Sequence, residues 1–321
     1  ALTDFWRQLI MTAMEKQDLT ATITNIQTMS TEDGPGIRTT VFMKGCSLRC
    51  LWCQNPEGLS PKTELAHEPL RCIDCGACLQ NCSAGALSRG ERGLIFGGSC
   101  RLCLKCAENC PAQAIRVFGE KMELEALLDR LIRDRPFYNH SGGGVTFSGG
   151  ECLLQHRFLL AALPKLRAAS VHSCIDTAGC VSPQVFKAVA SEADLVLYDL
   201  KIMDSEKHKL FTGASNKQIL ENAAWLGASG IPFWIRVPVI PEYTADEGNI
   251  RAIADFIRKQ VGPVERIDLL GYNDLCATDY EKLGLPYKLK AVPRVSKETM
   301  LALREIMLES GARRVTIANY A

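Results

Sequence analysis

The stretch KGCSLRCLWCQNPEG, residues 44–58, holds three cysteines in the spacing C-x3-C-x2-C and ends without a fourth. Metal sites built from cysteine commonly use four thiolates, so the last ligand of this group has to come from elsewhere. Three protein ligands on a four-iron cluster leave one iron open, as three protein ligands on a catalytic zinc ion leave a position for water or substrate. The charged residues within the stretch argue against three buried structural cysteines. Cys46, Cys50 and Cys53 therefore predict an iron–sulfur cluster with one open iron.

Eight further cysteines form two copies of the spacing C-x2-C-x2-C-x3-C, namely Cys72, Cys75, Cys78 and Cys82, then Cys100, Cys103, Cys106 and Cys110. This spacing binds [4Fe–4S] clusters in bacterial ferredoxins, because a cubane needs four soft thiolates at its corners. In two-cluster ferredoxins the last cysteine of each copy ligates the other cluster. We therefore expect Cys110 to complete the first group and Cys82 the second. Zinc is the alternative for any C-x2-C pair, but zinc sites do not use eight cysteines in this duplicated frame.

The composition limits the class of protein and its partners. With 37 Lys and Arg against 36 Asp and Glu, the formal net charge of the 321-residue chain is +1, which gives no reason to expect a nucleic-acid partner. No run of about 18 apolar residues occurs, and the first residues have neither the apolar centre nor the cleavage site of a signal peptide. We expect a cytoplasmic protein that does not contact a membrane. Fifteen cysteines suggest disulfides only in a small secreted domain, whereas this chain can bury a core without them.

Apolar, β-rich runs alternate along the chain with segments of helical periodicity. The expected strands are 22–30, 39–45, 144–150, 171–177, 194–200, 232–240 and 265–272, and the expected helices are 121–135, 156–169, 183–193, 218–230, 249–260 and 296–311. Near-continuous apolar strands that alternate with amphipathic helices favour a parallel sheet buried on both faces. The predicted fold class is therefore α/β.

Two groups of motifs carry a resemblance to known families. The three-cysteine spacing, with the aromatic Trp52 before its last cysteine, resembles the radical S-adenosylmethionine superfamily, in which the open iron is chelated by the amino and carboxylate groups of the cofactor's methionine moiety. The stretch STEDGPGIRTTVFMKGC at 30–46, the insert with two cluster motifs and the stretch GGGVTFSGGE at 142–151 together resemble the activating enzymes of glycyl radical enzymes. The resemblance runs from about Thr22 to the C-terminus.

The resemblance implies a fold and a domain organisation. The fold expected from it is a partial (β/α)6 TIM-like barrel with an inserted ferredoxin-like domain that carries two [4Fe–4S] clusters. The barrel would comprise residues 21–64 and 118–321, the insert 65–117, and residues 1–20 would form an N-terminal extension. The insert would be held together by its clusters rather than by an apolar core.

The active site of a parallel barrel lies at the C-terminal ends of its strands, and the motif FSGGE follows one of the predicted strands. Paired glycines allow a backbone to approach a ligand closely, and a glutamate can pair with an ammonium group. The resemblance implies that Gly149, Gly150 and Glu151 contact the amino group of the methionine moiety. Cys152 stands where the family has a proline. Taken alone, the glycines could equally be plain turns.

Two further strand ends match the family, at the motifs IDTAG and YDLK. The resemblance implies a monovalent cation site beside the cofactor, formed by Asp176, Thr177 and Asp199. Lys201 can neutralise a carboxylate at the same place. Without the resemblance, an isolated aspartate at a strand end would be read as a helix N-cap.

The remaining matches concern the cofactor and a partner protein. Arg236 resembles a cofactor-contacting arginine, with a buried ion pair as the alternative interpretation. Asn273 stands where the family usually has a histidine; it can donate and accept hydrogen bonds but cannot titrate. The motif DGPGIR resembles the segment that holds the partner's glycine loop, with Asp33 and Arg38 as the expected contacts. The five lone histidines are expected to be surface or packing groups.

The function implied by the resemblance is activation of another enzyme. An electron would reduce the cluster at the three-cysteine site, cleave S-adenosylmethionine to methionine and a 5′-deoxyadenosyl radical, and so remove a hydrogen from one glycine of a partner glycyl radical enzyme. One alternative is a radical enzyme that acts on a small molecule or peptide. The second alternative is a ferredoxin-type electron-transfer protein, which has no use for a three-ligand site.

The cofactors expected are three [4Fe–4S] clusters, S-adenosylmethionine and a monovalent cation, and the electron donor expected is a flavodoxin or a ferredoxin-type protein. The chain is expected to be a monomer. Activating enzymes with such an insert serve decarboxylases, dehydratases and lyases. Choline trimethylamine-lyase is the partner we expect, although no residue of the chain points to it.

Overall fold

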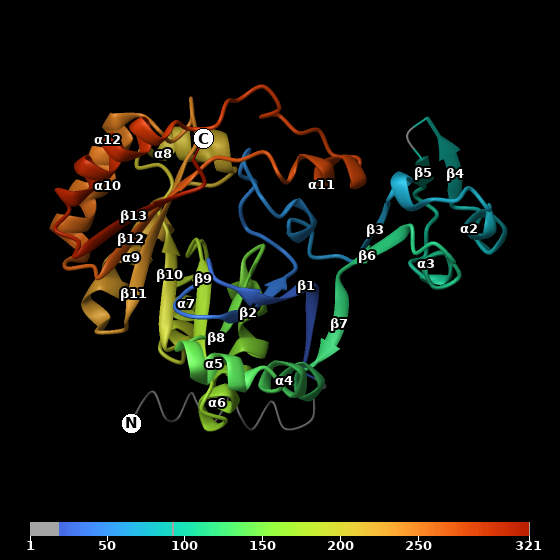
Figure 1. Ribbon diagram of the computed structural model, residues 1–321, viewed down its shortest axis with the longest axis horizontal. Coiled ribbons are helices and arrows are strands. Elements are labelled where there is room, and N and C mark those ends of the chain that lie inside the picture. The colour runs from blue at the N-terminus through green and yellow to red at the C-terminus, as the bar shows by residue number, and fades with distance from the viewer. Residues whose placement is uncertain (1–18, 92, 321) are drawn as a thin grey trace.

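The computed structural model describes residues 19–91 and 93–320, and its centre is one nine-stranded sheet (Figure 1). Seven neighbouring strands run parallel, in the order β2, β8, β9, β10, β11, β12 and β13, while β1 and β7 continue the sheet antiparallel beyond β2. The strands span Thr20–Ser30 (β1), Arg38–Met43 (β2), Glu120–Glu123 (β7), Gly144–Gly149 (β8), His172–Thr177 (β9), Leu195–Asp199 (β10), Phe233–Val239 (β11), Arg266–Gly271 (β12) and Arg314–Ala318 (β13). The predicted N-terminal extension lies outside the described residues as far as position 18.

Helices connect the parallel strands, and most of them cover one face of the sheet (Figure 1). They span Leu124–Ile132 (α4), Arg135–Ser141 (α5), His156–Ala168 (α6), Pro183–Ala190 (α7), Ser205–Thr212 (α8), Lys217–Ser229 (α9), Glu247–Phe256 (α10), Ala277–Lys282 (α11) and Lys297–Leu308 (α12). The main core lies between these helices and the sheet, where Val41, Phe147 and Ile175 are fully buried. Among the described residues no helix is both long and apolar enough to cross a membrane.

The opposite face of the parallel strands is polar at several positions, which corrects the expectation of strands that are apolar on both faces. Thr40 and Thr146 donate their hydroxyls to Asp33, the first to its side chain at 2.7 Å and the second to its carbonyl oxygen at 2.7 Å. Ser148 donates to Asp176 at 2.7 Å. Because side chains alternate along a strand, β2 and β8 bury apolar groups against the helices while their polar groups face inward.

Six other elements differ from the sequence-based expectation. β13 was not predicted, although it continues the parallel sheet beyond β12. Residues 121–122 belong to the edge strand β7 rather than to the following helix, because they pair with Ala21 and Thr22 of β1. The helices α5, α8 and α11 were also not predicted, since each is eight residues or shorter and shows little helical periodicity. The segment predicted as a helix over 249–260 ends in a π-helical turn, Ile257–Val261.

The segment from β3 (Glu64–His67) to β6 (Ile115–Phe118) forms the small unit at one side of Figure 1. Its outer strands β3 and β6 pair antiparallel, and so do β4 (Leu87–Gly90) and β5 (Gly93–Phe96). The one-turn helices α2 (Ala77–Gln80) and α3 (Lys105–Glu108) each follow a residue with positive φ, Gly76 at 70° and Leu104 at 61°. The two halves therefore repeat the same backbone path 28 residues apart, as their cysteines do.

A buried lysine connects this unit to the three-cysteine stretch. The Lys44 side chain is fully buried, and its ammonium group donates to the carbonyl oxygen of Glu57 and to the carboxylate of Glu64, both at 2.6 Å. The short 3-10 helix Pro56–Gly58 (η1) ends the stretch. Lys44 therefore joins both ends of the cysteine stretch to the first strand of the small unit.

Candidate functional site

The three-cysteine stretch forms a loop over the C-terminal edge of the sheet, directly after β2. Backbone hydrogen bonds hold both of its sides: Gly45 donates to the carbonyl oxygen of Gly58 at 2.8 Å, and Arg49 donates to that of Thr212 at 2.6 Å. Cys46, Cys50 and Cys53 are all partly buried. These hydrogen bonds tie the loop to its own end and to the end of α8.

Burial raises the pKa of all three thiols. Desolvation, and after it the neighbouring Glu151 carboxylate, raises the pKa of Cys46 to about 12. Desolvation likewise raises the pKa of Cys50 and of Cys53 above the ordinary range. A bound cationic cluster is what converts such thiols to thiolates, because it supplies the positive charge that the buried site lacks.

The donor set suits a cluster better than a single metal ion. Within residues 19–91 and 93–320, no three His, Cys, Asp or Glu side chains converge as closely as one ion requires. Four thiolates on one zinc ion lie about 2.3 Å from the metal, so their sulfurs nearly touch, whereas the thiolates of a cubane bind different irons. The all-sulfur donors are consistent with clusters.

The turn after β8 packs against the cysteine loop. A Cβ on Gly150 would lie 2.3 Å from the carbonyl oxygen of Gly45 and 2.4 Å from that of Gly58, so only glycine allows this approach. Glu151 then donates its backbone N–H to Gly45 at 2.7 Å. Gly149, with φ at 109°, similarly has no room beside Met43 of β2. The glycine pair was predicted to admit a ligand; in this structure it admits the backbone of the cysteine loop.

Glu151 is almost completely buried and links two strand ends. Its carboxylate accepts hydrogen bonds from the hydroxyl of Thr177 at 2.7 Å and from the backbone N–H groups of Leu153 at 3.2 Å and Ala178 at 3.1 Å. Burial raises its pKa to about 7, and these hydrogen bonds oppose the shift. The carboxylate that was expected to bind an ammonium group therefore also holds the end of β9 in place.

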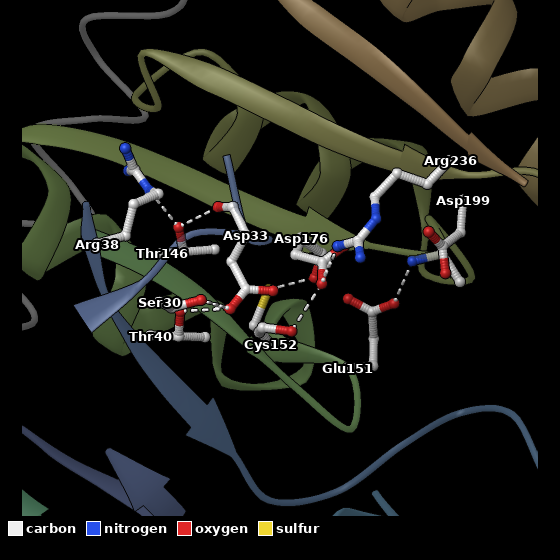
Figure 2. A network of polar contacts seen from close by, with 12 residues as sticks. Ser30, Asp33, Arg38, Thr40, Thr146, Glu151, Cys152, Asp176, Asp199 and Arg236 are labelled. Carbon is white, nitrogen blue, oxygen red and sulfur yellow. Dashed lines mark hydrogen bonds and ion pairs between the residues drawn. The ribbon is translucent and has the colours of Figure 1, made fainter. Parts of the chain in front are cut away.

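Asp176 and Asp199 lie on the inner face of adjacent strands, each beside a cation. The carboxylate of Asp176 is 3.0 Å from the guanidinium of Arg236 (Figure 2). The carboxylate of Asp199 is 2.6 Å from the ammonium of Lys201. Desolvation raises the pKa of Asp176, and Arg236 lowers it. Burial lowers the pKa of Arg236, but the surrounding carboxylates, of which Asp176 contributes most, together leave the pKa above its usual value. The buried ion pair that was the alternative interpretation of Arg236 is present.

Thr177 does not join these two carboxylates. Neighbouring residues of a strand point to opposite faces, and Thr177 is buried on the face opposite to Asp176. Its hydroxyl donates to Glu151 and accepts from the backbone N–H of Gly179 at 2.9 Å. The predicted cation site thus reduces, among side chains, to Asp176 and Asp199.

Arg38 is buried, whereas the resemblance led us to expect a contact with a partner protein. Its side chain is fully buried, and its guanidinium donates to the hydroxyl of Thr146 at 2.6 Å and to the carbonyl oxygens of Val145 at 2.6 Å and Pro35 at 3.1 Å. Asp33 also points inward and accepts from Ser30 at 2.6 Å (Figure 2). The motif DGPGIR therefore anchors its own loop inside the barrel.

Trp52 and Asn273 lie beside the cysteine loop in ways the sequence did not indicate. Trp52 is 5% exposed and packs in a second apolar cluster, together with Ile202, Ile240, Tyr272 and Leu289. The carbonyl oxygen of Asn273 accepts a hydrogen bond from Gln54 at 2.9 Å, and its side chain caps the backbone of Leu275 at 3.2 Å. Trp52 is therefore primarily a packing residue.

The eight cysteines of the small unit line two separate cavities. One cavity is lined by Cys72, Cys75, Cys78 and Cys110, and the other by Cys82, Cys100, Cys103 and Cys106. This is the grouping expected from two-cluster ferredoxins. The last cysteine of each copy also accepts a backbone N–H at its sulfur, Cys82 from Ala86 at 3.3 Å and Cys110 from Ala114 at 3.2 Å.

Sequence reasoning missed three residues that touch the predicted site. Ser148, which donates to Asp176, lies within the quoted motif FSGGE, and its alternation with Phe147 was an available signal. Tyr280 donates to the carbonyl oxygen of Cys53 at 3.1 Å from α11, and no sequence pattern indicated this contact. His67 is 7% exposed and lines the first cavity, although it was expected to be a surface or packing group.

Comparisons with known proteins agree on one superfamily. The radical SAM superfamily profile matches residues 40–257. The isethionate sulfite-lyase activating enzyme of Desulfovibrio desulfuricans is 40% identical over 91% of this chain and 96% of its own. The (2S)-3-sulfopropanediol dehydratase activating enzyme of Klebsiella oxytoca is 38% identical over 84% and 87%, and the choline trimethylamine-lyase activating enzyme of Oleidesulfovibrio alaskensis is 37% identical over 86% and 91%. A radical SAM methyltransferase from Sphaerobacter thermophilus shares the fold, with a TM-score of 0.52, 12% identity and coverage of 97% and 85%.

Proposed function

The chain belongs to the radical SAM superfamily and, within it, to the activating enzymes of glycyl radical enzymes, and on this premise we propose that Cys46, Cys50 and Cys53 hold the cluster that binds S-adenosylmethionine. The observation that carries the proposal is the convergence of the ends of β2, β8, β9 and β10 at one edge of the sheet. When bound, the cluster and S-adenosylmethionine supply a 5′-deoxyadenosyl radical that removes a hydrogen from a glycine of the partner enzyme.

The residues of the chain prepare this site by position and charge. Gly150 and Glu151 bring the end of β8 against the cysteine loop, so the two parts of the site keep a constant separation. Arg236 and Asp176 form a neutral pair, and so do Lys201 and Asp199. A zwitterionic ligand such as the methionine moiety can exchange partners with such pairs without adding net charge to a buried site.

The monovalent cation belongs to the same proposal, with Asp176 and Asp199 as its carboxylate ligands. Lys201 and Arg236 compete with it, because each already neutralises one of these carboxylates. Comparing S-adenosylmethionine cleavage in potassium, sodium and tetramethylammonium salts of equal ionic strength tests the site. Loss of activity with the bulky organic cation is expected, and equal activity in all three would remove the cation from the proposal.

We propose that the small unit holds two further [4Fe–4S] clusters. The two cavities support this assignment, since each is lined by four cysteines drawn from both copies of the motif. The anaerobically reconstituted protein should then contain about 12 iron atoms, three cubanes of four. A content near eight together with normal cleavage of S-adenosylmethionine would show that one insert cluster is absent.

The three-cysteine site is tested by removing its ligands. Replacing Cys46, Cys50 or Cys53 by Ala should abolish reductive cleavage of S-adenosylmethionine and leave about eight irons in the small unit. Cleavage that survives these substitutions would disprove the assignment. Cys152→Ala is the matched control, because this cysteine is fully buried near the site and is not a proposed ligand.

The proposed partner is a glycyl radical enzyme, and the proposed electron donor is a flavodoxin or ferredoxin-type protein that acts on a monomer of this chain. Relatives named for isethionate sulfite-lyase, 3-sulfopropanediol dehydratase and choline trimethylamine-lyase match at 37–40% identity, so identity does not single out the last. Mixing the reduced protein and S-adenosylmethionine with each candidate partner, and recording the glycyl radical by electron paramagnetic resonance, identifies the enzyme that it activates.

A further inference from the structure

The two cavities of the small unit repeat each other closely, which makes their differences informative. The first is lined by His67 from β3 and Leu94 from β5, and the second by Phe96 from β5 and Leu65 from β3. When β3 in one cavity is compared with β5 in the other, His67 is equivalent to Phe96 and Leu94 is equivalent to Leu65. One cavity therefore has an imidazole where the other has an apolar ring.

The imidazole of His67 is held in a defined orientation. Its Nδ1 accepts the backbone N–H of Leu94 at 3.2 Å, so in the neutral ring the proton lies on Nε2. A Cβ on Gly93 would approach Nδ1 to 2.2 Å, so the start of β5 lies tightly against this edge of the ring. Burial lowers the pKa of His67, which favours the neutral form.

The other ring nitrogen of His67 is a buried donor. Nε2 of His67 is inaccessible to solvent and finds no hydrogen-bond partner among the residues that the structure describes. An unsatisfied buried donor costs about 1–3 kcal/mol, so its persistence calls for an acceptor. The cavity that His67 lines contains four cysteine sulfurs, Cys72, Cys75, Cys78 and Cys110.

We propose that Nε2–H of His67 donates a hydrogen bond to a sulfur of the cluster held by these four cysteines, and that this donor raises the reduction potential of that cluster above that of the other. The inference rests on the two insert clusters of the proposed function. Reduction adds negative charge to a cluster, and a hydrogen-bond donor at its sulfur stabilises the reduced form. His67 acts through the cluster and is therefore a positioning and tuning residue.

The consequence is an order between two otherwise similar clusters. Phe96 offers no donor to the second cluster, so an electron entering the small unit rests preferentially on the first. Arg89 also lines the first cavity, but its guanidinium is half exposed and contacts Asp74, so its charge is compensated. Arg101 lines the second cavity, but this side chain is exposed, so water and salt screen its charge. His67 is thus the buried polar side chain that distinguishes the first cavity.

The experiment is a redox titration followed by electron paramagnetic resonance. It uses the full chain with Cys46, Cys50 and Cys53 replaced by Ala, so that only the insert clusters titrate. His67→Phe should lower one of the two reduction potentials by about 59 mV, which corresponds to an about tenfold change in a one-electron redox equilibrium. The other reduction potential should stay unchanged. His67→Gln, which keeps an acceptor and an N–H donor, should restore most of the shift. Phe96→Leu is the matched control and should move neither potential by that amount.

Unchanged potentials in a His67→Phe protein with about eight irons would overturn the proposal. If this variant loses iron, the test is made on the parent chain, which keeps His67. When its histidines are labelled with 15N, the reduced protein should show a coupling of the cluster's electron spin to 15N in electron spin-echo envelope modulation. The other four histidines belong to the barrel, so lack of this coupling would also overturn the proposal. Failure of the proposed clusters is distinguishable, because the parent chain itself would then contain well below eight irons.

Discussion

Replacing Gly150 by alanine should disable the cysteine loop without unfolding the small unit. The new Cβ would lie 2.3 Å from the carbonyl oxygen of Gly45 and 2.4 Å from that of Gly58. Non-bonded contacts of carbon are optimal at about 3.5 Å, so each oxygen has to withdraw by about 1 Å. Both oxygens belong to the backbone and cannot rotate away as a flexible side chain would.

The magnitude follows from where the strain is relieved. Overpacking of this kind costs about 1–3 kcal/mol. Gly45 directly precedes the first proposed ligand, Cys46, and Gly58 closes the loop, so the cost falls on the arrangement that binds the cluster. An energy of this size shifts an equilibrium by about 5- to 150-fold. Cleavage of S-adenosylmethionine should fall by that factor, and the iron content should decline from about 12 toward about eight.

The assay is anaerobic reconstitution followed by iron analysis and measurement of 5′-deoxyadenosine. Gly98→Ala is the matched control, because a Cβ there meets nothing within 4 Å and its φ lies outside the left-handed region. The control should keep full iron and full activity. A Gly150→Ala protein with both properties intact would refute the argument that this turn supports the loop.

Four further substitutions test other parts of the structure. Arg38→Met should lower the free energy of unfolding by about 2–4 kcal/mol, because it leaves Thr146 and several carbonyl oxygens without a hydrogen-bond donor. The affinity of the folded protein for its partner should stay unchanged. Urea denaturation checks the first expectation, and a binding titration checks the second. Burial raises the pKa of Glu151 from 4.5 to about 7, so the unfolded chain loses this proton at a lower pH than the folded protein does. The stability of the iron-free protein should therefore fall by about 3 kcal/mol as the pH rises from 4.5 to about 7. Glu151→Gln should flatten this part of the stability curve, and an unchanged slope would contradict it. Replacing Cys75 or Cys103 by Ser should leave binding of S-adenosylmethionine intact. If the insert relays electrons, turnover should fall more with a protein electron donor than with a small reductant. An equal loss with both reductants, in variants that circular dichroism shows to be folded, would favour docking.

Much of the barrel could be predicted because its elements carry local signals. The helix Lys297–Leu308 begins after Ser296, whose hydroxyl accepts the backbone N–H of Thr299 at 3.2 Å, and ends near the expected position. β13 could not be predicted, because five residues with a partly exposed pattern carry too little periodicity. Its place is set by pairing with β12, which is a contact between distant segments.

The cysteine spacings by themselves indicated the chemistry. Thiolate ligands within one turn are local in sequence, so C-x3-C-x2-C and the duplicated C-x2-C-x2-C-x3-C can be recognised without a fold. The same holds for the strand ends at Glu151, Asp176 and Asp199, since parallel strands end at one edge of their sheet. The sequence therefore determined which residue types gather at that edge.

Only the tertiary structure decided what each of these side chains contacts. Asp176 faces Arg236 whereas Thr177 faces Glu151, because the two strand residues point to opposite faces of the sheet. Arg38 lies in a motif that resembles a partner-binding segment, yet it is enclosed by the loop that it anchors. Burial and hydrogen-bond partners depend on segments more than 100 residues away in the chain, such as Val145 beside Arg38, and a local pattern contains no information about them.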